Sequence, residues 1–325
     1  MAKIIDSFLF FQELDLLEIR LEYLYDKVDN FIILEACQTF TGKRKPFNFE
    51  NNKYRFERYL DKILYFKIED SHDSYKSVIS FLKSKDDKVH GQVADILESH
   101  AHYPKDELHW VLDTYHRESL QIAYDKFIED EDIIFLSDLD EIPASKIFDD
   151  TRILNSSKPV VCRQHEFMYF LNYYSNSDWL GTILSKYKNI KNESLCLLRM
   201  DSKEIRNLVD KKEYRNGGYH FTSIGSVEDI KRKIQSWGHQ EYNTKGILDR
   251  LEYNINTGQD IFEREYGTKM SKIEFSDIRI FDKNIANILS KYDSLITKSN
   301  ISIVGKYSIY NIFRYISSKI IRKLG

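Results

Sequence analysis

Three carboxylates stand close together in the segment Ile133–Pro143, IIFLSDLDEIP. Asp138 and Asp140 form a D-x-D pair, and Glu141 follows directly. In an extended segment, residues i and i+2 point to the same side, so the two aspartates can converge on one centre while Glu141 points away. Hard oxygen ligands of this kind suit Mg²⁺ or Mn²⁺, which also bind diphosphate oxygens. The pattern predicts either a metal and diphosphate site or an acidic loop in which Asp138 forms a turn.

The apolar run before these acids indicates where they should lie. IIFL is typical of a buried strand. In open α/β sheets, ligands bind beyond the carboxyl ends of the strands, so this strand would carry both aspartates to the ligand-binding edge. Pro143 is expected in the first turn of a following helix, where its missing N–H costs nothing.

The elements that must position this strand alternate in type along the chain. Strands are expected in KIIDSFLFF, VDNFIILEA and KILYFKI, and helices in ELDLLEIRLEYLYDKV and NKYRFERYLDK. VDNFIILEA is a continuous apolar run, typical of a strand buried on both faces. The alternation predicts an α/β fold with a mostly parallel central sheet flanked by helices.

The remaining segments are less regular. Residues 70–106 are polar, and we expect a helical insertion there, with its histidines on the solvated surface because their spacing does not suit a helical metal site. Further on, the patterns predict a helix in LHWVLDTYHRESLQIAYDKFI, a strand in PVVCRQHEFMYFLNYY with a candidate hairpin partner in LGTILSKYKNI, a loop or strand in RNGGYHFTSIG, and a capped helix in SVEDIKRKIQSW.

Composition limits the class of protein. The chain has 325 residues, 42% apolar and 30% charged, a balance typical of a globular protein. A formal charge of −3 gives no bulk electrostatic case for nucleic acid. Three cysteines without metal or disulfide spacing favour a reducing cytoplasm. The 22 tyrosines and 20 phenylalanines indicate core packing or contact with sugar rings.

Domain organisation follows from the absence of repeats and of Pro/Ser-rich linkers. We expect one domain over residues 1–295 and a separate tail over residues 296–325. The N-terminal segment is interpreted as a first strand rather than a signal peptide, and no apolar stretch approaches membrane-spanning length. The tail alternates apolar with basic residues, so it is expected to form a helix that either packs on the domain or lies on a membrane surface.

Five segments, taken in order, resemble glycosyltransferase family 17, the family of the bisecting β-1,4-mannosyl-glycoprotein N-acetylglucosaminyltransferase and its bacterial relatives. They are ELDLLEIRLEYLYDKVDNFIILEACQTFTGKRKPFNF, WVLDTYHRESL, SDLDEIP, GGYHFTSIGSVEDIKRKIQSWGHQEYNT and RLEYNINTGQDIFER. The chain departs from the family pattern at Asp113, where Glu is usual, at His116, where Gln is usual, and at Tyr219, where Trp is usual. The likeness covers residues 3–270 apart from the insertion.

The resemblance implies a GT-A-like fold and an inverting transfer of a sugar, with N-acetylglucosamine as one candidate. The donor would be a nucleotide-diphosphate sugar, and the acceptor a glycan or a lipid-linked glycan. Asp138, Asp140 and His220 would hold Mn²⁺ or Mg²⁺. The donor-binding positions carried over are Glu35, Thr39, Gly42, Arg117, Asp138, Asp140, Gly218 and His220. Three of these residues also have a purely structural interpretation. Glu35 could be an acid in a surface loop, Arg117 could pair with an acid of the core, and Gly218 could allow a sharp turn.

An inverting transfer needs a base that takes the proton of the acceptor hydroxyl, and a carboxylate is the usual solution. The candidates are Glu166, Glu241 and Glu141, and we prefer Glu166 because its strand could face the acceptor. By analogy, the chain is expected to act in bacterial surface-polysaccharide synthesis, in the cytoplasm and at the inner face of the cytoplasmic membrane. Two alternatives stay open: a metal-dependent phosphohydrolase or nucleotidyltransferase that uses the same aspartates, and a non-catalytic glycan-binding protein.

Overall fold

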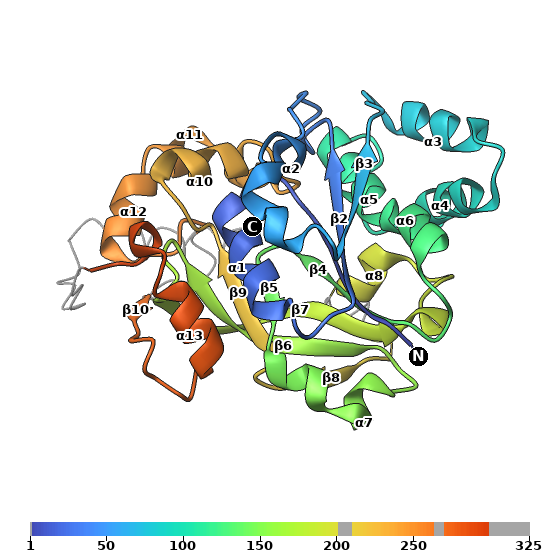
Figure 1. Cartoon of the computed structure of the whole chain (residues 1–325). Coiled ribbons are helices and arrows are strands. Elements are labelled where there is room, and N and C mark those ends of the chain that lie inside the picture. The colour runs from blue at the N-terminus through green and yellow to red at the C-terminus, as the bar shows by residue number, and fades with distance from the viewer. Residues whose placement is uncertain (1, 201–209, 263–269, 299–325) are drawn as a thin grey trace.

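The computed structural model describes residues 2–200, 210–262 and 270–298 (Figure 1). Ten strands of these ranges form one sheet in the order β3-β2-β1-β4-β7-β6-β9-β5, with β8 beside β6 and β10 beside β7. The strands are β1 (Ile4–Leu9), β2 (Asn30–Ala36), β3 (Ile63–Ile68), β4 (Ile133–Asp138), β5 (Glu141–Pro143), β6 (Val160–Met168), β7 (Tyr173–Lys186), β8 (Lys212–Tyr214), β9 (Gly218–Thr222) and β10 (Ser271–Lys272). The fold is the predicted α/β class, a central sheet flanked by helices.

Helices cover both faces of this sheet (Figure 1). They are α1 (Leu14–Leu24), α2 (Asn48–Asn51), α3 (Tyr75–Ser84), α4 (Lys88–Ser99), α5 (Leu108–Glu118), α6 (Leu120–Phe127), α7 (Thr151–Leu154), α8 (Leu195–Arg199), α10 (Val227–Ile234), α11 (Lys245–Leu248), α12 (Leu251–Thr257) and α13 (Lys283–Leu289). Phe135 of β4 packs in one core with Leu17 of α1, and its neighbour Ile134 packs in the opposite core with Leu112 of α5. Strand β4 is therefore buried on both faces, as its apolar run predicts.

The N-terminal half of the sheet is parallel. Strands β3, β2, β1 and β4 run in the same direction, and Leu9 at the end of β1 is in register with Leu34 of β2 and Asp138 of β4. The carboxyl ends of these strands therefore meet at one edge of the sheet. This placement confirms that the apolar run of β4 delivers its acids to the edge where α/β proteins bind ligands.

The C-terminal half of the sheet is mixed. Strand β7 runs antiparallel to both β4 and β6, so the expected hairpin is present. Its turn comes earlier than expected, because β6 ends at Met168 and Tyr173 and Tyr174 begin β7. Strand β9 lies between β6 and β5, in a register that pairs His220 with Glu166 on one side and with Glu141 on the other. Residues far apart in the sequence are thereby brought next to the end of β4.

Two helix predictions need correction. Pro143 does not start a helix; it is the last residue of β5 and pairs with Gly218 of β9. Strand β5 is the last in the sheet order, and an edge strand tolerates a proline that cannot donate to the ladder. The single helix expected from Leu108 onwards is divided into α5 and α6 at Ser119, whose hydroxyl donates to the carbonyl of Tyr115 at 2.7 Å, a bond of the kind that bends helices.

The expectation that the histidines of the insertion lie on the solvated surface is wrong for His72 and His100, which are buried. Several other expectations hold. The insertion over residues 70–106 is helical and forms α3 and α4. The capped helix is α10, where Ser226 and Asp229 satisfy each other's backbone N–H groups in a capping box. Within the described ranges, no helix combines the length and apolarity needed to cross a membrane. The basic tail lies outside the described residues from position 299 onwards.

Candidate active site

A buried arginine shapes the acidic loop after β4. Arg20 of α1 is fully buried and forms a two-point ion pair with Asp6 of β1, with N–O distances of 2.6 and 2.7 Å. Its Nη1 also donates to the backbone oxygens of Asp138, Leu139 and Glu141 at 2.9 to 3.0 Å. A guanidinium presents five donors in fixed directions, so these bonds hold the loop in one shape.

Asp138 is held by two arginines. Its Oδ1 accepts a hydrogen bond from Arg117 of α5 at 2.6 Å, and its Oδ2 accepts one from Arg199 of α8 at 2.8 Å. Burial alone would raise the pKa of Asp138, but the two guanidinium groups lower it well below its usual range. Asp138 is therefore ionised at neutral pH, and its charge is already balanced inside the protein.

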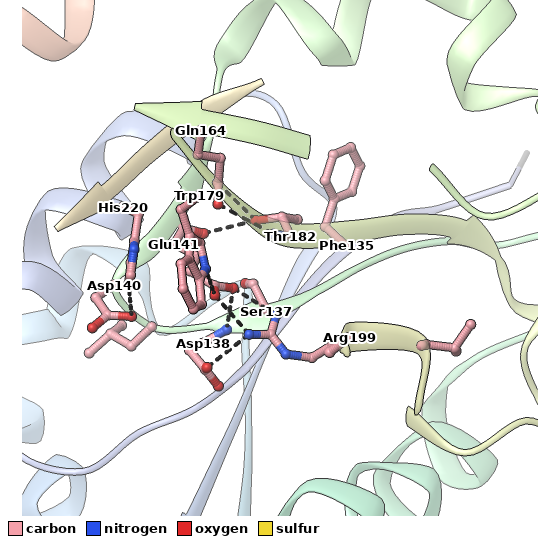
Figure 2. Close-up of polar contacts among 12 residues, drawn as sticks. Phe135, Ser137, Asp138, Asp140, Glu141, Gln164, Trp179, Thr182, Arg199 and His220 are labelled. Carbon is pink, nitrogen blue, oxygen red and sulfur yellow. Dashed lines mark hydrogen bonds and ion pairs between the residues drawn. The ribbon is translucent and has the colours of Figure 1, made fainter. Parts of the chain in front are cut away.

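Glu141 shares one of these arginines. Arg199 donates to both of its carboxylate oxygens, at 2.6 and 2.8 Å, and the indole N–H of Trp179 donates to Oε1 at 2.7 Å (Figure 2). Burial would raise the pKa of Glu141, but Arg199 lowers it below its usual value. A carboxylate with a lowered pKa and three side-chain donors is a poor proton acceptor. This geometry argues against Glu141 as the base.

Asp140 has a different environment. Lys233 of α10 donates to its Oδ2 at 2.8 Å and lies 3.2 Å from Glu13. Burial would lower the pKa of Lys233, but Asp140 and Glu13 raise it above its usual value, so the lysine stays charged. The other oxygen, Oδ1, lies 3.8 Å from Nε2 of His220. Asp140 is thus neutralised on one side and faces a histidine on the other.

His220 connects Asp140 to Glu166. Its Nδ1 is buried, makes no hydrogen bond, and lies 3.8 Å from Oε1 of Glu166. Its ring is stacked on the indole of Trp179, with ring centres 4.8 Å apart and an interplanar angle of 30° (Figure 2). Glu166 itself accepts a hydrogen bond from the hydroxyl of Ser177 at 2.7 Å. Strands β6, β7 and β9 supply this group of side chains.

These residues border a cavity of about 450 Å³ at the carboxyl ends of β1, β2 and β4. Its volume is that of natural small-molecule sites. Charged residues line one part: Glu13, Lys45, Asp113, Arg117, Asp138, Asp140, Glu141 and Lys233. Aromatic residues line much of the rest: Phe10, Phe11, Phe40, Trp110, Trp179, Trp237, Tyr242 and Phe262. All three tryptophans of the chain therefore face one cavity.

The expected metal ligands are only partly brought together. Within the described residues, no three His, Cys, Asp or Glu side chains are arranged to hold a metal ion. Both oxygens of Asp138 are bound by arginines, whereas Oδ1 of Asp140 and Nε2 of His220 face each other. Mg²⁺ commonly takes one or two protein ligands and completes its shell with phosphate oxygens and water. Asp140 and His220 fit a site of that kind, and Asp138 does not.

Glu35 is a structural residue rather than a lining residue of the cavity. It is fully buried, and its carboxylate accepts hydrogen bonds from Lys45, from the hydroxyl of Tyr65, and from the backbone N–H groups of Asn48 and Phe49 at 2.6 to 3.0 Å. It therefore caps the start of α2. Neither the nucleoside contact nor the surface-loop acid considered from the sequence matches this placement.

The other expected donor-binding positions divide into two groups. Thr39 and Arg117 line the cavity. Gly42 forms the turn that follows Thr39, with φ of 84°, and Gly218 has φ of 146°, both in the range that favours glycine. A Cβ on Gly218 would lie 2.2 Å from the backbone oxygen of Ile142, so this glycine allows β5 and β9 to pair. Both glycines therefore act through the backbone and do not line the cavity.

Glu241 lies apart from the site. Its side chain is 53% exposed, pairs with Nδ1 of His239 at 2.7 Å, and does not line the cavity. Sequence reasoning missed Arg20, Lys233, Arg199 and Trp179. Arg20 and Lys233 lie within segments that carry the family resemblance, but no local pattern distinguishes any of the four, because each reaches the acids from a distant part of the chain.

The fold and the cavity together define an α/β protein with a charged ligand site at the ends of parallel strands. The model of glycosyltransferase family 17 matches residues 1–90, which confirms the resemblance for this part of the chain and supports a glycosyltransferase. The match ends before β4, so the assignment of the acids rests on their geometry. A sequence search against curated proteins gave no match.

Solved structures with similar folds have low similarity scores. A 4-diphosphocytidyl-2C-methyl-D-erythritol synthase from Anaerococcus prevotii is 14% identical, with 70% of this chain and 93% of that chain covered and a TM-score of 0.34. A mannosyltransferase from Pyrobaculum calidifontis in complex with GDP-Man and Mn²⁺ is 8% identical, with 98% and 80% covered and a TM-score of 0.34. Mouse xyloside xylosyltransferase 1 is 12% identical, with 61% and 71% covered and a TM-score of 0.28. At these TM-scores and identities, the activities of the three proteins are not assigned to this chain.

Proposed function

We propose that this protein transfers a sugar from a nucleotide-diphosphate sugar to a glycan acceptor. The observation that carries the proposal is the cavity at the end of β4, where Arg117 and Lys233 stand beside Asp138 and Asp140. The family match over residues 1–90 supports the same class of reaction. Cationic side chains in a cavity of this size suit a diphosphate, and the aromatic walls suit a base and sugar rings.

In the proposed reaction, the acceptor hydroxyl attacks the anomeric carbon of the donor sugar as the bond to the diphosphate oxygen breaks. Inversion of the anomeric carbon and N-acetylglucosamine as the sugar stay parts of the proposal. Lys233 and Arg117 would stabilise the negative charge that develops on the leaving diphosphate. A Mg²⁺ or Mn²⁺ ion held by Asp140 and His220 would supply further positive charge for the same purpose when bound.

Glu166 stays the proposed base. Glu141 is committed to Arg199 and Trp179, and Glu241 lies outside the cavity. Glu166 does not line the cavity either, but it is buried against His220, the lining histidine that faces Asp140, whereas Glu241 is half exposed and contacts His239. Replacement of Glu166 by Gln should lower kcat by about a hundredfold or more while donor affinity is retained, because general bases contribute rate factors of that order. The matched variant Glu241→Gln should keep kcat within about twofold, since this half-exposed carboxylate does not line the cavity and contacts His239 at its border.

The biological setting is also proposed rather than established. We propose a lipid-linked or surface-polysaccharide acceptor, a cytoplasmic location, and contact of the basic tail with the inner face of the cytoplasmic membrane. The test is flotation with anionic liposomes, with and without residues 304–325. Loss of flotation on deletion supports membrane contact, and equal flotation of both proteins contradicts it.

A thermal-shift panel tests the proposed function. UDP-, GDP-, TDP- and ADP-sugars are added to the wild-type protein with and without Mn²⁺, because a ligand that binds the folded state raises the melting temperature. At least one should stabilise the wild type, and Asp140→Asn should weaken the shift, whereas Asp106→Asn at an exposed position should not. No shift with any donor contradicts the proposal. Release of inorganic phosphate without sugar transfer would instead favour a phosphohydrolase.

A further inference from the structure

We propose that the indole of Trp179 is the platform on which the donor sugar ring stacks. This inference rests on the proposed function and deepens it, because it names the group that recognises the sugar. Trp179 lies on β7, lines the cavity, and leaves 36% of its surface exposed. An open aromatic surface in a ligand cavity is a contact surface for an apolar face of a ligand.

The indole is held in a fixed orientation. One of its faces is stacked on His220 at 4.8 Å, and its N–H donates to Glu141 at 2.7 Å. Glu141 is in turn fixed by the two-point hydrogen bond from Arg199. Trp179 is therefore ordered before a ligand arrives, and a pre-organised contact loses little entropy on binding.

Strand β7 leaves room for this arrangement at Gly181, two residues after the tryptophan. A Cβ at position 181 would lie 2.9 Å from Cδ1 of Trp179, 3.0 Å from Cδ of Glu141 and 2.0 Å from Oε1 of Gln164. Any side chain there would displace the amide of Gln164 and press on the indole and the carboxylate. The indole, the carboxylate and the glycine thus form one packed unit.

Position identifies the sugar as that of the donor. Trp179 contacts both Glu141 and His220. Glu141 shares Arg199 with Asp138, and His220 faces Asp140. In a nucleotide-diphosphate sugar, the sugar is bonded directly to the diphosphate. A diphosphate bound by Arg117 and Lys233, beside the two aspartates, therefore brings the donor sugar next to this indole.

The other two tryptophans of the cavity lie elsewhere. Trp110 is on α5, seven residues before Arg117, a separation of about 10 Å along a helix. It and Trp237 both contact His239. In this proposal, Trp110 and Trp237, which share the contact with His239, face the nucleoside or the acceptor.

The chemistry of the contact follows from the indole. Its π-face carries negative partial charge and attracts the C–H groups on the apolar face of a pyranose ring. The indole N–H is already donated to Glu141, so the platform recognises the ring by its face and not by a hydrogen bond. It should strengthen the binding of a nucleotide sugar and leave the binding of the free nucleoside diphosphate unchanged.

Isothermal titration separates these contributions. UDP-N-acetylglucosamine is compared with UDP, and GDP-mannose with GDP, on the full-length protein with Mn²⁺. Trp179→Ala should weaken the nucleotide sugar about two- to tenfold, the range given by aromatic stacking, with the nucleoside diphosphate unchanged. Trp179→Phe should keep most of the affinity. Trp179→Leu, which retains apolar bulk without an aromatic face, should behave like alanine and serves as the second variant if alanine prevents folding.

Trp110→Ala is the matched control, and it should not change the ratio of the two affinities. An equal ratio of nucleotide-sugar to nucleoside-diphosphate affinity in the wild type, Trp179→Ala and Trp179→Leu would overturn the inference while the proposed function stands. If the wild type binds neither the nucleoside diphosphates nor their sugars, the proposed function falls, and the inference falls with it.

Discussion

Replacement of Arg199 by Met should destabilise the protein strongly. The arginine side chain is 9% exposed, and its partner Glu141 is 1% exposed. Methionine keeps much of the apolar bulk but leaves a buried carboxylate without its cation. Removal of one partner from a buried ion pair typically costs about 3–5 kcal/mol. Glu141 keeps hydrogen bonds from Trp179 and from the backbone N–H of Asp138, so we expect the lower end, about 3 kcal/mol of the free energy of unfolding.

The assay is urea unfolding at pH 7 of the wild type, Arg199→Met, Glu141→Gln and the double variant. Glutamine removes the charge that the arginine balances and can still accept from Trp179, so the double variant should recover about 2 kcal/mol relative to the sum of the single losses. The pH dependence of the free energy of unfolding also follows from this ion pair. Arg199 holds the pKa of Glu141 below its unfolded value, so this contribution is present above the unfolded pKa and is lost as pH falls through the folded pKa. An Arg199→Met loss under about 1 kcal/mol, or purely additive effects, would refute this reasoning.

Three further predictions concern positions around the site. Burial lowers the pKa of His116 to about 3. Below about pH 6.5, therefore, only the unfolded chain binds a proton at this position. The free energy of unfolding then falls on acidification by up to about 1.4 kcal/mol per pH unit. His116→Gln should flatten the profile of unfolding free energy between pH 6 and 4, and an unchanged slope contradicts this. Gly181→Ala should cost about 1–3 kcal/mol by overpacking against Gln164 and Trp179, and calorimetry with an unaltered melting temperature would disprove it. Asp70 accepts from Tyr115 at 2.6 Å, so Asp70→Asn should speed amide exchange in α3 about tenfold, while equal rates would show that this bond does not anchor the insertion.

Local patterns predicted the parts of the fold that local physics determines. The apolar run before Asp138 identifies a strand buried on both faces, and the β-α-β alternation then places its end at the ligand edge. The prediction of α10 holds for the same reason, since the Ser226–Asp229 capping box is encoded within a few residues. Pro143 was misassigned because its strand forms only through pairing with β9.

The cationic partners of the acids could not be predicted from the sequence. Arg199 lies 61 positions after Asp138, and Lys233 lies 93 positions after Asp140. Neither spacing constitutes a motif, because contact arises only when α8 and α10 pack beside the end of β4. Glu35 shows the opposite failure: it follows the pattern of a ligand residue at a strand end, yet the start of α2 uses its whole carboxylate.

Binding of a nucleotide-diphosphate sugar at the end of β4 is tested most directly by isothermal titration of the wild type, Lys233→Met and Lys231→Met. Lys231 lies on the same helix and is exposed, so it controls for net charge. Lys231→Met should bind the nucleotide sugar with the affinity of the wild type, and the nucleoside diphosphate likewise. Lys233→Met should weaken both by about tenfold or more, since a charge-assisted hydrogen bond contributes about 1.5–3 kcal/mol. Equal affinity in all three proteins, or no binding by the wild type, would contradict a donor site in this cavity.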